Sequence, residues 1–121
     1  MRVELLRFTL ATDGDIHLAV AEPGKPDATM IAEIPDPARM TGAPKKYREE
    51  VGVTRRAFIR AFGAPMLNAW HDVNREVAIT GPIFFDLISS QIGGSAAGAP
   101  TAVEIHPVLR LEIARQGKTA R

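Results

Sequence analysis

The stretch RVELLRFTLATDGDIHLAVAE, residues 2–22, decides the expected fold because two β-rich runs flank a turn signal. Asp13-Gly14 is a dipeptide that favours the positive φ angles of hairpin turns. In the second run, every second residue is a large apolar one, and these residues would point to one side of a strand: Ile16, Leu18 and Val20. We therefore expect two antiparallel strands, at about 3–11 and 16–22.

The rest of the chain predicts one helix and three further strands. PGKPD, residues 23–27, indicates a turn because each proline fixes φ and removes a donor, and ATMIAEI, residues 28–34, follows as a third strand. Between residues 44 and 62, spacings of four, seven and four place a stripe along a helix: Tyr47, Val51, Phe58 and Phe62. Gly52 weakens the middle of this helix, which predicts a bend or break there.

Two segments after the helix return to strand character. In REVAITGPIFFDL, residues 75–87, Gly81-Pro82 predicts a bulge or sharp bend. VEIHPVLRLEI, residues 103–113, predicts the last strand, and the uncharged segment 89–100 between the two predicts a loop. The last five residues, 117–121, are expected to be a frayed tail.

The order of these elements predicts a mainly β fold. Five short antiparallel strands with one helix between strands 3 and 4 bury their apolar faces best as a small barrel plugged at one end by the helix. This is the element order of the OB fold, a five-stranded, partly open Greek-key barrel. We expect one OB-like domain over residues 1–116.

Composition excludes several classes of function. The 121 residues include no cysteine, so a disulfide framework, a thiolate nucleophile and a cysteine-based metal site are excluded, and we expect no cofactor. A formal charge of +1 gives no long-range field that attracts polyanions. No uninterrupted apolar run has the length of a signal peptide's apolar region or the ~18 residues needed to span a bilayer. We expect a cytoplasmic protein without a membrane partner, or alternatively a mature secreted domain.

Three stretches resemble a family of small bacterial domains of unknown function. They are GDIHLAVAE with TMIAEIPDP (residues 14–37), VAITGPIFFD (77–86) and VEIHPV (103–108). The family has similar phrases, DYHLV, TMIAEIPDP, VTGVGFFD and ELHPV, in the same order. The resemblance covers most of the chain and implies a β-rich, OB-like domain, and no activity comes with it.

The chain departs from the family pattern at two places. Family members commonly have a histidine soon after FFD, whereas this chain has Ser89 and Ser90 in that neighbourhood. They often have a cysteine just after IPDP, where this chain has Ala38 and Arg39. If either family residue has a chemical role, this chain lacks it.

The last strand carries one candidate site. Alternation places Glu104 and His106 on the same face, and Asp86 from the preceding strand could come near them. Such a group could act as a general base or hold a metal weakly. The structural alternative is that the two side chains form hydrogen bonds along the sheet surface, with Pro107 marking a ladder edge or bulge.

A second candidate site lies on strands two and three, the surface through which an OB barrel usually binds its ligand. His17 and Glu33 are on these strands, next to the Asp13-Gly14 turn and the expected loop 89–100. Strands two and three contain no Phe, Tyr, Trp, Lys or Arg, so the large stacking platforms and the cations of a single-stranded nucleic-acid site are absent from this face. The candidate ligand-binding residues are His17, Glu33, Asp86, Glu104 and His106.

The polar side of the helix is rich in cations: Lys45, Lys46, Arg48, Arg55, Arg56 and Arg60. Such a face is either solvated or binds an anion. The leading functional hypothesis is a non-enzymatic binding or interaction module for a protein or a small polar ligand. The first alternative is a single-stranded nucleic-acid-binding protein, whose cations would be Arg2, Arg7, Arg110 and Arg115. The second is a metal-dependent hydrolase using Asp86, Glu104 and His106.

Overall fold

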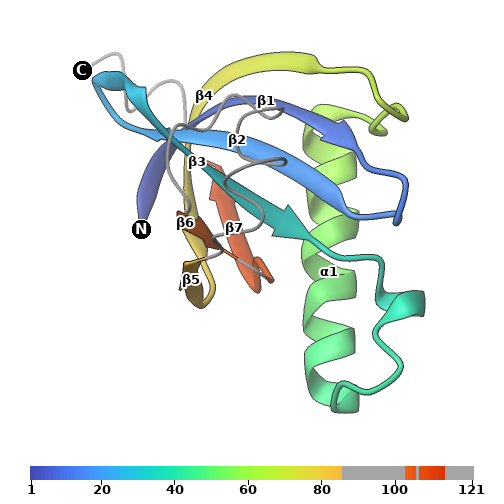
Figure 1. The fold of residues 1–121 in the computed structure, drawn as a ribbon. Helices are drawn as coiled ribbons and strands as arrows, with labels where there is room; N and C mark the ends of the chain where they lie inside the picture. The colour runs from blue at the N-terminus through green and yellow to red at the C-terminus, as the bar shows by residue number, and fades with distance from the viewer. Residues whose placement is uncertain (86–102, 106, 114–121) are drawn as a thin grey trace.

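The computed structural model describes residues 1–85, 103–105 and 107–113 of the chain. Figure 1 shows a curled sheet with one long helix beside it. The elements in chain order are β1 (Arg2–Leu10), β2 (Ile16–Glu22), β3 (Lys25–Ile34), the 3₁₀ helix η1 (Pro37–Arg39), α1 (Lys45–Phe62), β4 (His71–Thr80), β5 (Ile83–Phe85), β6 (Val103–Ile105) and β7 (Arg110–Ile113). No helix in the described ranges has the length and apolar character needed to cross a membrane.

The fold is mainly β, and the described strands form a single sheet in the order β5-β6-β3-β2-β1-β4-β7. Neighbours are antiparallel except β3 and β6, which are parallel. The predicted helix between the third and fourth strands is confirmed. The prediction of a closed five-stranded barrel is wrong for the described residues, because the hydrogen-bonded sheet is open, with β5 and β7 as its edges.

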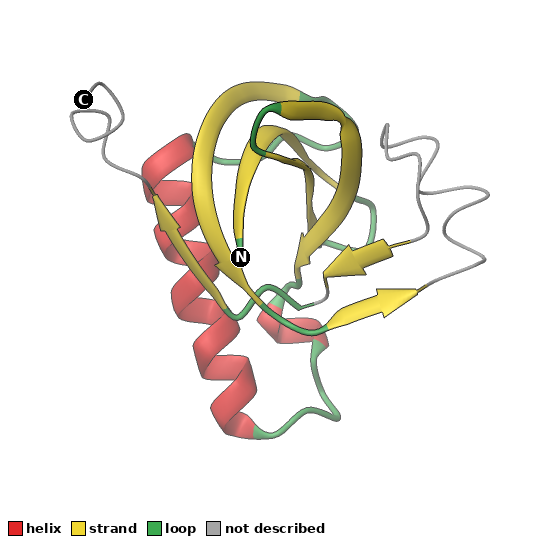
Figure 2. Cartoon of the chain, turned by 90° about the vertical axis from the view of Figure 1, so that its left-hand side faces the viewer, coloured by secondary structure: helices red, strands yellow, loops and turns green. Residues whose placement is uncertain are grey.

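The sheet stays open because the predicted last strand is divided in two. Its first half, β6, pairs with β3, and its second half, β7, pairs with β4. Pro107 lies between the halves and has no N–H for a continuous ladder. Val108 N donates to Glu33 O at 2.8 Å, and Leu109 N donates to Thr80 O at 2.7 Å. Residues 103–113, the crossing segment, therefore pair with β3 at one end and with β4 at the other, and Figure 2 shows how strongly the sheet curls.

Two hairpins form the N-terminal part of the sheet, as the sequence predicts. In the β1–β2 connection Ala11 N donates to Asp15 O at 2.9 Å, and Gly14 has a φ of 89°. The β2–β3 turn is tighter than predicted: it contains only Pro23 and Gly24, so β3 begins at Lys25. A register shift between Leu5 and Arg7 bends β1 against both of its neighbours, which increases the local twist of the sheet.

The predicted bend at Gly81-Pro82 is confirmed and separates β4 from β5. A Cβ on Gly81 would lie 2.2 Å from the carbonyl oxygen of Pro107 in the crossing segment. Only glycine allows the backbones to approach this closely. β4 begins earlier than predicted, at His71, whose ring stacks on Phe8 with centroids 4.9 Å apart.

The helix α1 runs without a break through Gly52 for 18 residues. Val51 and Phe58 are fully buried, and Phe58 packs edge-on against Phe8 of β1 at 4.8 Å. Tyr47 is 47% exposed, so its predicted place in the buried stripe is wrong. The reason is its position: Figure 1 shows the first turn of α1 extending past the sheet.

One apolar cluster holds the sheet and helix together. It combines the inward side chains of the strands with the buried helix positions and the crossing segment: Val3, Leu5, Phe8, Ile16, Leu18, Val20, Ala32, Ile34, Val51, Phe58, Val77, Ile79, Ile105 and Val108. Thr54 Oγ1 of α1 also donates to Leu109 O at 2.6 Å. The crossing segment is thus fixed between the helix and the two strands that it joins.

Candidate functional site

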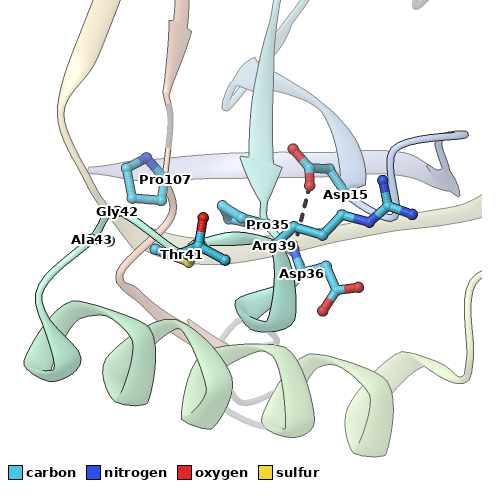
Figure 3. Close-up of a pocket in the computed structure, with 9 residues that line it drawn as sticks. Asp15, Pro35, Asp36, Arg39, Thr41, Gly42, Ala43 and Pro107 are labelled. Atoms are coloured by element: carbon cyan, nitrogen blue, oxygen red, sulfur yellow. Dashed lines mark hydrogen bonds between the residues drawn. The ribbon is translucent and has the colours of Figure 1, made fainter.

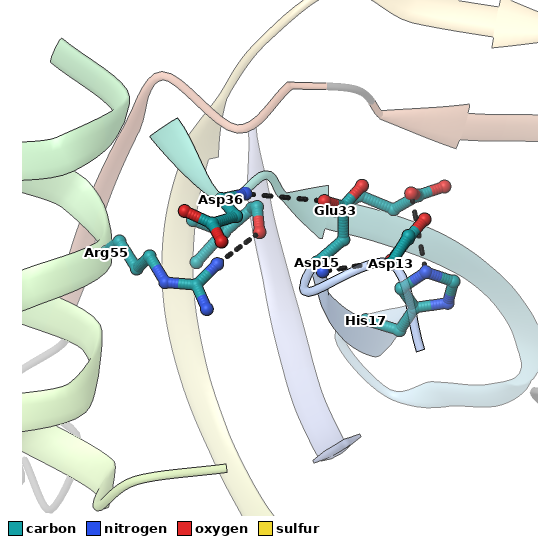
Figure 4. A network of polar contacts seen from close by, with 7 residues as sticks. Asp13, Asp15, His17, Glu33, Asp36 and Arg55 are labelled. Atoms are coloured by element: carbon teal, nitrogen blue, oxygen red, sulfur yellow. Dashed lines mark hydrogen bonds and ion pairs between the residues drawn. The ribbon is translucent and has the colours of Figure 1, made fainter. Parts of the chain in front are cut away.

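The structure brings two of the predicted site residues, His17 and Glu33, directly opposite each other on β2 and β3. His17 Nε2 lies 3.4 Å from Glu33 Oε1, with the side chains 27% and 12% exposed (Figure 4). The contact is an ion pair when the imidazole is protonated. The sequence placed the two residues on neighbouring strands, and the register of the β2–β3 hairpin sets them opposite each other.

The middle of the predicted β2–β3 ligand face is not accessible. Ala19, Ala21 and Ile31, which follow His17 and precede Glu33 along the two strands, are all buried. A planar ligand has no open platform there. The half-buried His17–Glu33 pair lies at the end of the two strands, next to the β1–β2 turn and η1.

At this end of the sheet, aspartates accept hydrogen bonds from the backbone (Figure 4). Asp15 Oδ1 accepts from Asp36 N at 3.3 Å, which ties the β1–β2 turn to the exit of β3. Asp36 Oδ1 accepts from Ala38 N at 3.0 Å and caps η1, and Asp13 Oδ1 accepts from Asp15 N at 2.9 Å. Asp36 is placed to do so because Pro37 starts η1 immediately after it.

A hollow of about 340 Å³ lies beside these aspartates (Figure 3). We call it the η1 hollow, and its lining comes from the β1–β2 turn, the exit of β3, η1 and the crossing segment: Asp15, Pro35, Asp36, Arg39, Met40, Thr41, Gly42, Ala43 and Pro107. In Figure 3, Pro107 lies on one side and the aspartates with Arg39 on the other. Apolar side chains therefore form much of the wall, and charges of both signs lie at one end.

Arg39 supplies the positive charge of the η1 hollow and lies over the β1–β2 turn. A Cβ on Gly14 would be 3.2 Å from Asp36 Oδ2 and 3.6 Å from Arg39 Nε. Gly14 therefore gives both the positive φ of the turn and the room for these two side chains. The Arg39 side chain therefore lies close to Asp36 beside Gly14, and Arg39 is exposed.

The remaining predicted site residues are only partly described. Asp86 and His106 lie outside the described residues, as does the expected loop 89–100. Glu104 is in β6, where its backbone pairs with Ile31 of β3 and Phe84 of β5. Within the described ranges, no group of three His, Asp or Glu side chains could hold a metal ion.

Three arginines proposed for nucleic-acid contacts have partners within the protein. Arg2 forms an ion pair with Glu76, and Arg110 Nε lies 3.7 Å from Glu50 Oε2. The guanidinium of Arg7 lies 5.2 Å from the ring centre of Trp70. Arg115 is outside the described residues.

Sequence reasoning did not find the η1 hollow. Asp15, Arg39 and Pro107 are far apart in the chain, and their meeting depends on where the crossing segment passes. The one usable signal was EIPDP, since an aspartate before proline predicts a short helix start that would turn the chain back toward the sheet.

Comparison with known proteins found no matching family model, no matching curated protein and no matching solved structure. The resemblance to the small bacterial domains therefore stays a prediction, and the functional argument depends on the geometry of this chain.

Proposed function

We propose that the chain is a non-enzymatic binding module with an OB-like strand order, and that it binds a small polar ligand in the η1 hollow. The observation that carries the proposal is the hollow itself. It has about 340 Å³ of space, apolar walls and charges of both signs at one end. Sites for small ligands typically have such walls with a few converging polar groups, in volumes of about 300–1,000 Å³.

The charges indicate a ligand that carries both an amino group and a carboxylate. Arg39 presents a fork of N–H donors suited to a carboxylate. Asp36 accepts one backbone N–H through Oδ1, and a carboxylate has capacity for further donors such as an ammonium group. Pro35, Met40 and Pro107 then face the apolar part of the ligand.

The connectivity supports an OB-like interpretation although the sheet is open. The crossing segment runs parallel to β3 and antiparallel to β4, and β4 pairs with β1. OB folds bind ligands near strands two and three and the loop that joins strands one and two. The η1 hollow lies at this place, beside the His17–Glu33 pair and the turn that contains Asp15.

An NMR titration with three millimolar probes tests the proposal: alanine as a zwitterion, putrescine as a diamine and succinate as a dicarboxylate. We expect alanine to shift the backbone amides of residues 14–15, 36, 38–43 and 108. Putrescine and succinate, which each carry charges of one sign, should shift them less. Arg39→Ala should abolish the alanine response. Arg60→Ala removes an exposed arginine of α1 outside the hollow and should leave the response unchanged.

Two results would contradict the proposal. One is an absence of saturable shifts around the hollow for all three probes. The other is an equal loss of response in Arg39→Ala and Arg60→Ala, since only the first variant removes a lining residue.

A further inference from the structure

A second depression, the α1 groove, lies between η1 and α1. It has a volume of about 560 Å³ and is lined by Pro37, Ala38, Lys45, Arg48, Glu49, Gly52, Val53 and Arg56. The η1 hollow and the α1 groove share no lining residue. The groove is therefore a separate candidate site, formed by the cation-rich face of α1 against η1.

The helix spacing explains the shape of the groove. Lys45, Arg48, Gly52 and Arg56 are three, four and four residues apart, so they follow one face of α1. Gly52 has no side chain, and a Cβ there would be 3.3 Å from Arg56 Nη1 and 3.7 Å from Cγ of Pro37. The glycine therefore leaves room for the Arg56 guanidinium against the helix backbone and forms part of the groove lining.

The groove carries an excess of positive charge, with three cations and one carboxylate. The carboxylate, Glu49, lies 3.7 Å from Lys45 Nζ, and these side chains are 65% and 81% exposed. An exposed pair of this kind contributes little to stability. Among the described residues, no carboxylate pairs with Arg48 or Arg56.

Arg48 is partly enclosed along the groove. Its Nε is inaccessible to solvent and has no hydrogen-bond partner among the described residues. A ligand in the groove therefore cannot reach this atom, and the donors that Arg48 has for a ligand are those on its two Nη atoms.

The cations also contradict the usual charge preference of a helix start. Lys45 and Arg48 lie in the first turn of α1, which has no acidic side chain, and Pro44 provides no side-chain cap. The positive end of the helix dipole makes cations unfavourable there and anions favourable. Lys45 is compensated by Glu49 of the next turn, whereas no carboxylate among the described residues pairs with Arg48, and a local preference broken in this way indicates a functional constraint.

We propose that the α1 groove binds the phosphate group of a small phosphate monoester. Arg48 and Arg56 donate to the phosphate oxygens in the forked geometry that guanidinium groups provide, and Lys45 adds a point charge. Val53, Ala38 and Pro37 contact the organic part of the ligand. Among phosphate-bearing ligands, a small ester fits better than a nucleic acid, because Glu49 lies within the groove and the formal charge of the whole chain is only +1.

Isothermal titration calorimetry at low salt tests the proposal with AMP, adenosine and inorganic phosphate as probes. AMP should bind, adenosine should not, and inorganic phosphate should compete with AMP. Arg48→Ala and Arg56→Ala should each weaken AMP binding roughly 10- to 100-fold, the loss expected for a charge-assisted hydrogen bond. Arg60→Ala, on the same helix but outside the groove, should change the affinity less than about twofold.

Circular dichroism and thermal unfolding of each variant separate loss of binding from loss of fold. If Arg48→Ala fails to fold, the exposed Arg56 still provides the test. Equal affinity for AMP and adenosine, no binding of AMP, or an equal effect of Arg60→Ala would overturn the proposal. Tighter binding of a single-stranded oligonucleotide than of AMP, with the steep salt dependence of several phosphate contacts, would also overturn it.

Discussion

Replacing Gly81 by alanine probes the contact between the β4–β5 bend and the crossing segment. The added Cβ would lie 2.2 Å from Pro107 O and 2.9 Å from Cγ2 of Ile105. The carbonyl cannot move alone, because Val108 N is bonded to Glu33 O and Leu109 N to Thr80 O on either side of the curled sheet. Gly81→Ala therefore has to displace the backbone of the crossing segment.

The magnitude follows from these contacts. Overpacking costs about 1–3 kcal/mol, and weakening one of the two backbone hydrogen bonds adds about 1 kcal/mol, so we expect a loss of roughly 2–4 kcal/mol in the free energy of unfolding. With a urea m-value of about 2 kcal/mol/M, the unfolding midpoint falls by roughly 1–2 M. The assay is urea unfolding followed by far-UV circular dichroism.

Gly42→Ala is the matched control for this variant. A Cβ on Gly42 meets no atom within 4 Å, and Gly42 does not have a positive φ. The control should stay within about 0.5 kcal/mol of the parent or gain slightly in stability. Equal midpoints for the two variants would refute the reasoning, because the close crossing at Gly81 would then not exist.

Four further substitutions test the packing of α1. Phe58→Ala removes a fully buried ring and should lower the free energy of unfolding, measured in urea, by about 3–5 kcal/mol. Tyr47→Ala, at the exposed end of the same stripe, should lower it by under about 1 kcal/mol. Similar losses for the two variants would contradict this packing. Thr54→Val removes the hydrogen bond to Leu109 O and should cost about 1–3 kcal/mol in the same assay, and an unchanged midpoint would show that this bond is not formed. Gly52→Ala should raise the free energy of unfolding by up to about 1 kcal/mol, seen as a higher thermal midpoint. The added Cβ meets only the flexible end of Arg56 and makes an ordinary contact with the ring of Pro37. A clear loss of stability would mean that the helix and η1 are packed more rigidly.

The local features of the fold could be predicted from the sequence because they depend on neighbouring residues. Asp13-Gly14 predicts the first hairpin, and Gly81-Pro82 predicts the bend between β4 and β5. The burial of Val51 and Phe58 follows from helical spacing. Each of these conclusions needs only the conformational preference or the periodicity of a short segment.

The open sheet could not be predicted because it depends on which partners the crossing segment finds. Residues 103–113 have the alternation of a single strand, yet Pro107 divides them between β3 and β4. The exposure of Tyr47 likewise depends on how far the helix extends past the sheet. The periodicity of the sequence gives no information about this distance.

The candidate site was predicted in one part and missed in another. His17 and Glu33 were predicted on adjacent strands, and hairpin register places them opposite each other. Arg39 joins Asp15 and Asp36 only through the path of η1 over the β1–β2 turn, and Pro107 reaches them only through the crossing segment. Contacts between residues so far apart in the chain leave no pattern in a short segment of sequence.

The crossing segment, residues 103–113, provides one wall of the η1 hollow and joins β3 and β4 across the curled sheet. Interstrand NMR contacts between backbone protons are the decisive test of this crossing. We expect a parallel pattern around Ile31 and Glu104 together with an antiparallel pattern around Ile79 and Leu111. If residues 103–113 showed antiparallel contacts to β4 throughout, or none to β3, the crossing and the site built on it would be contradicted.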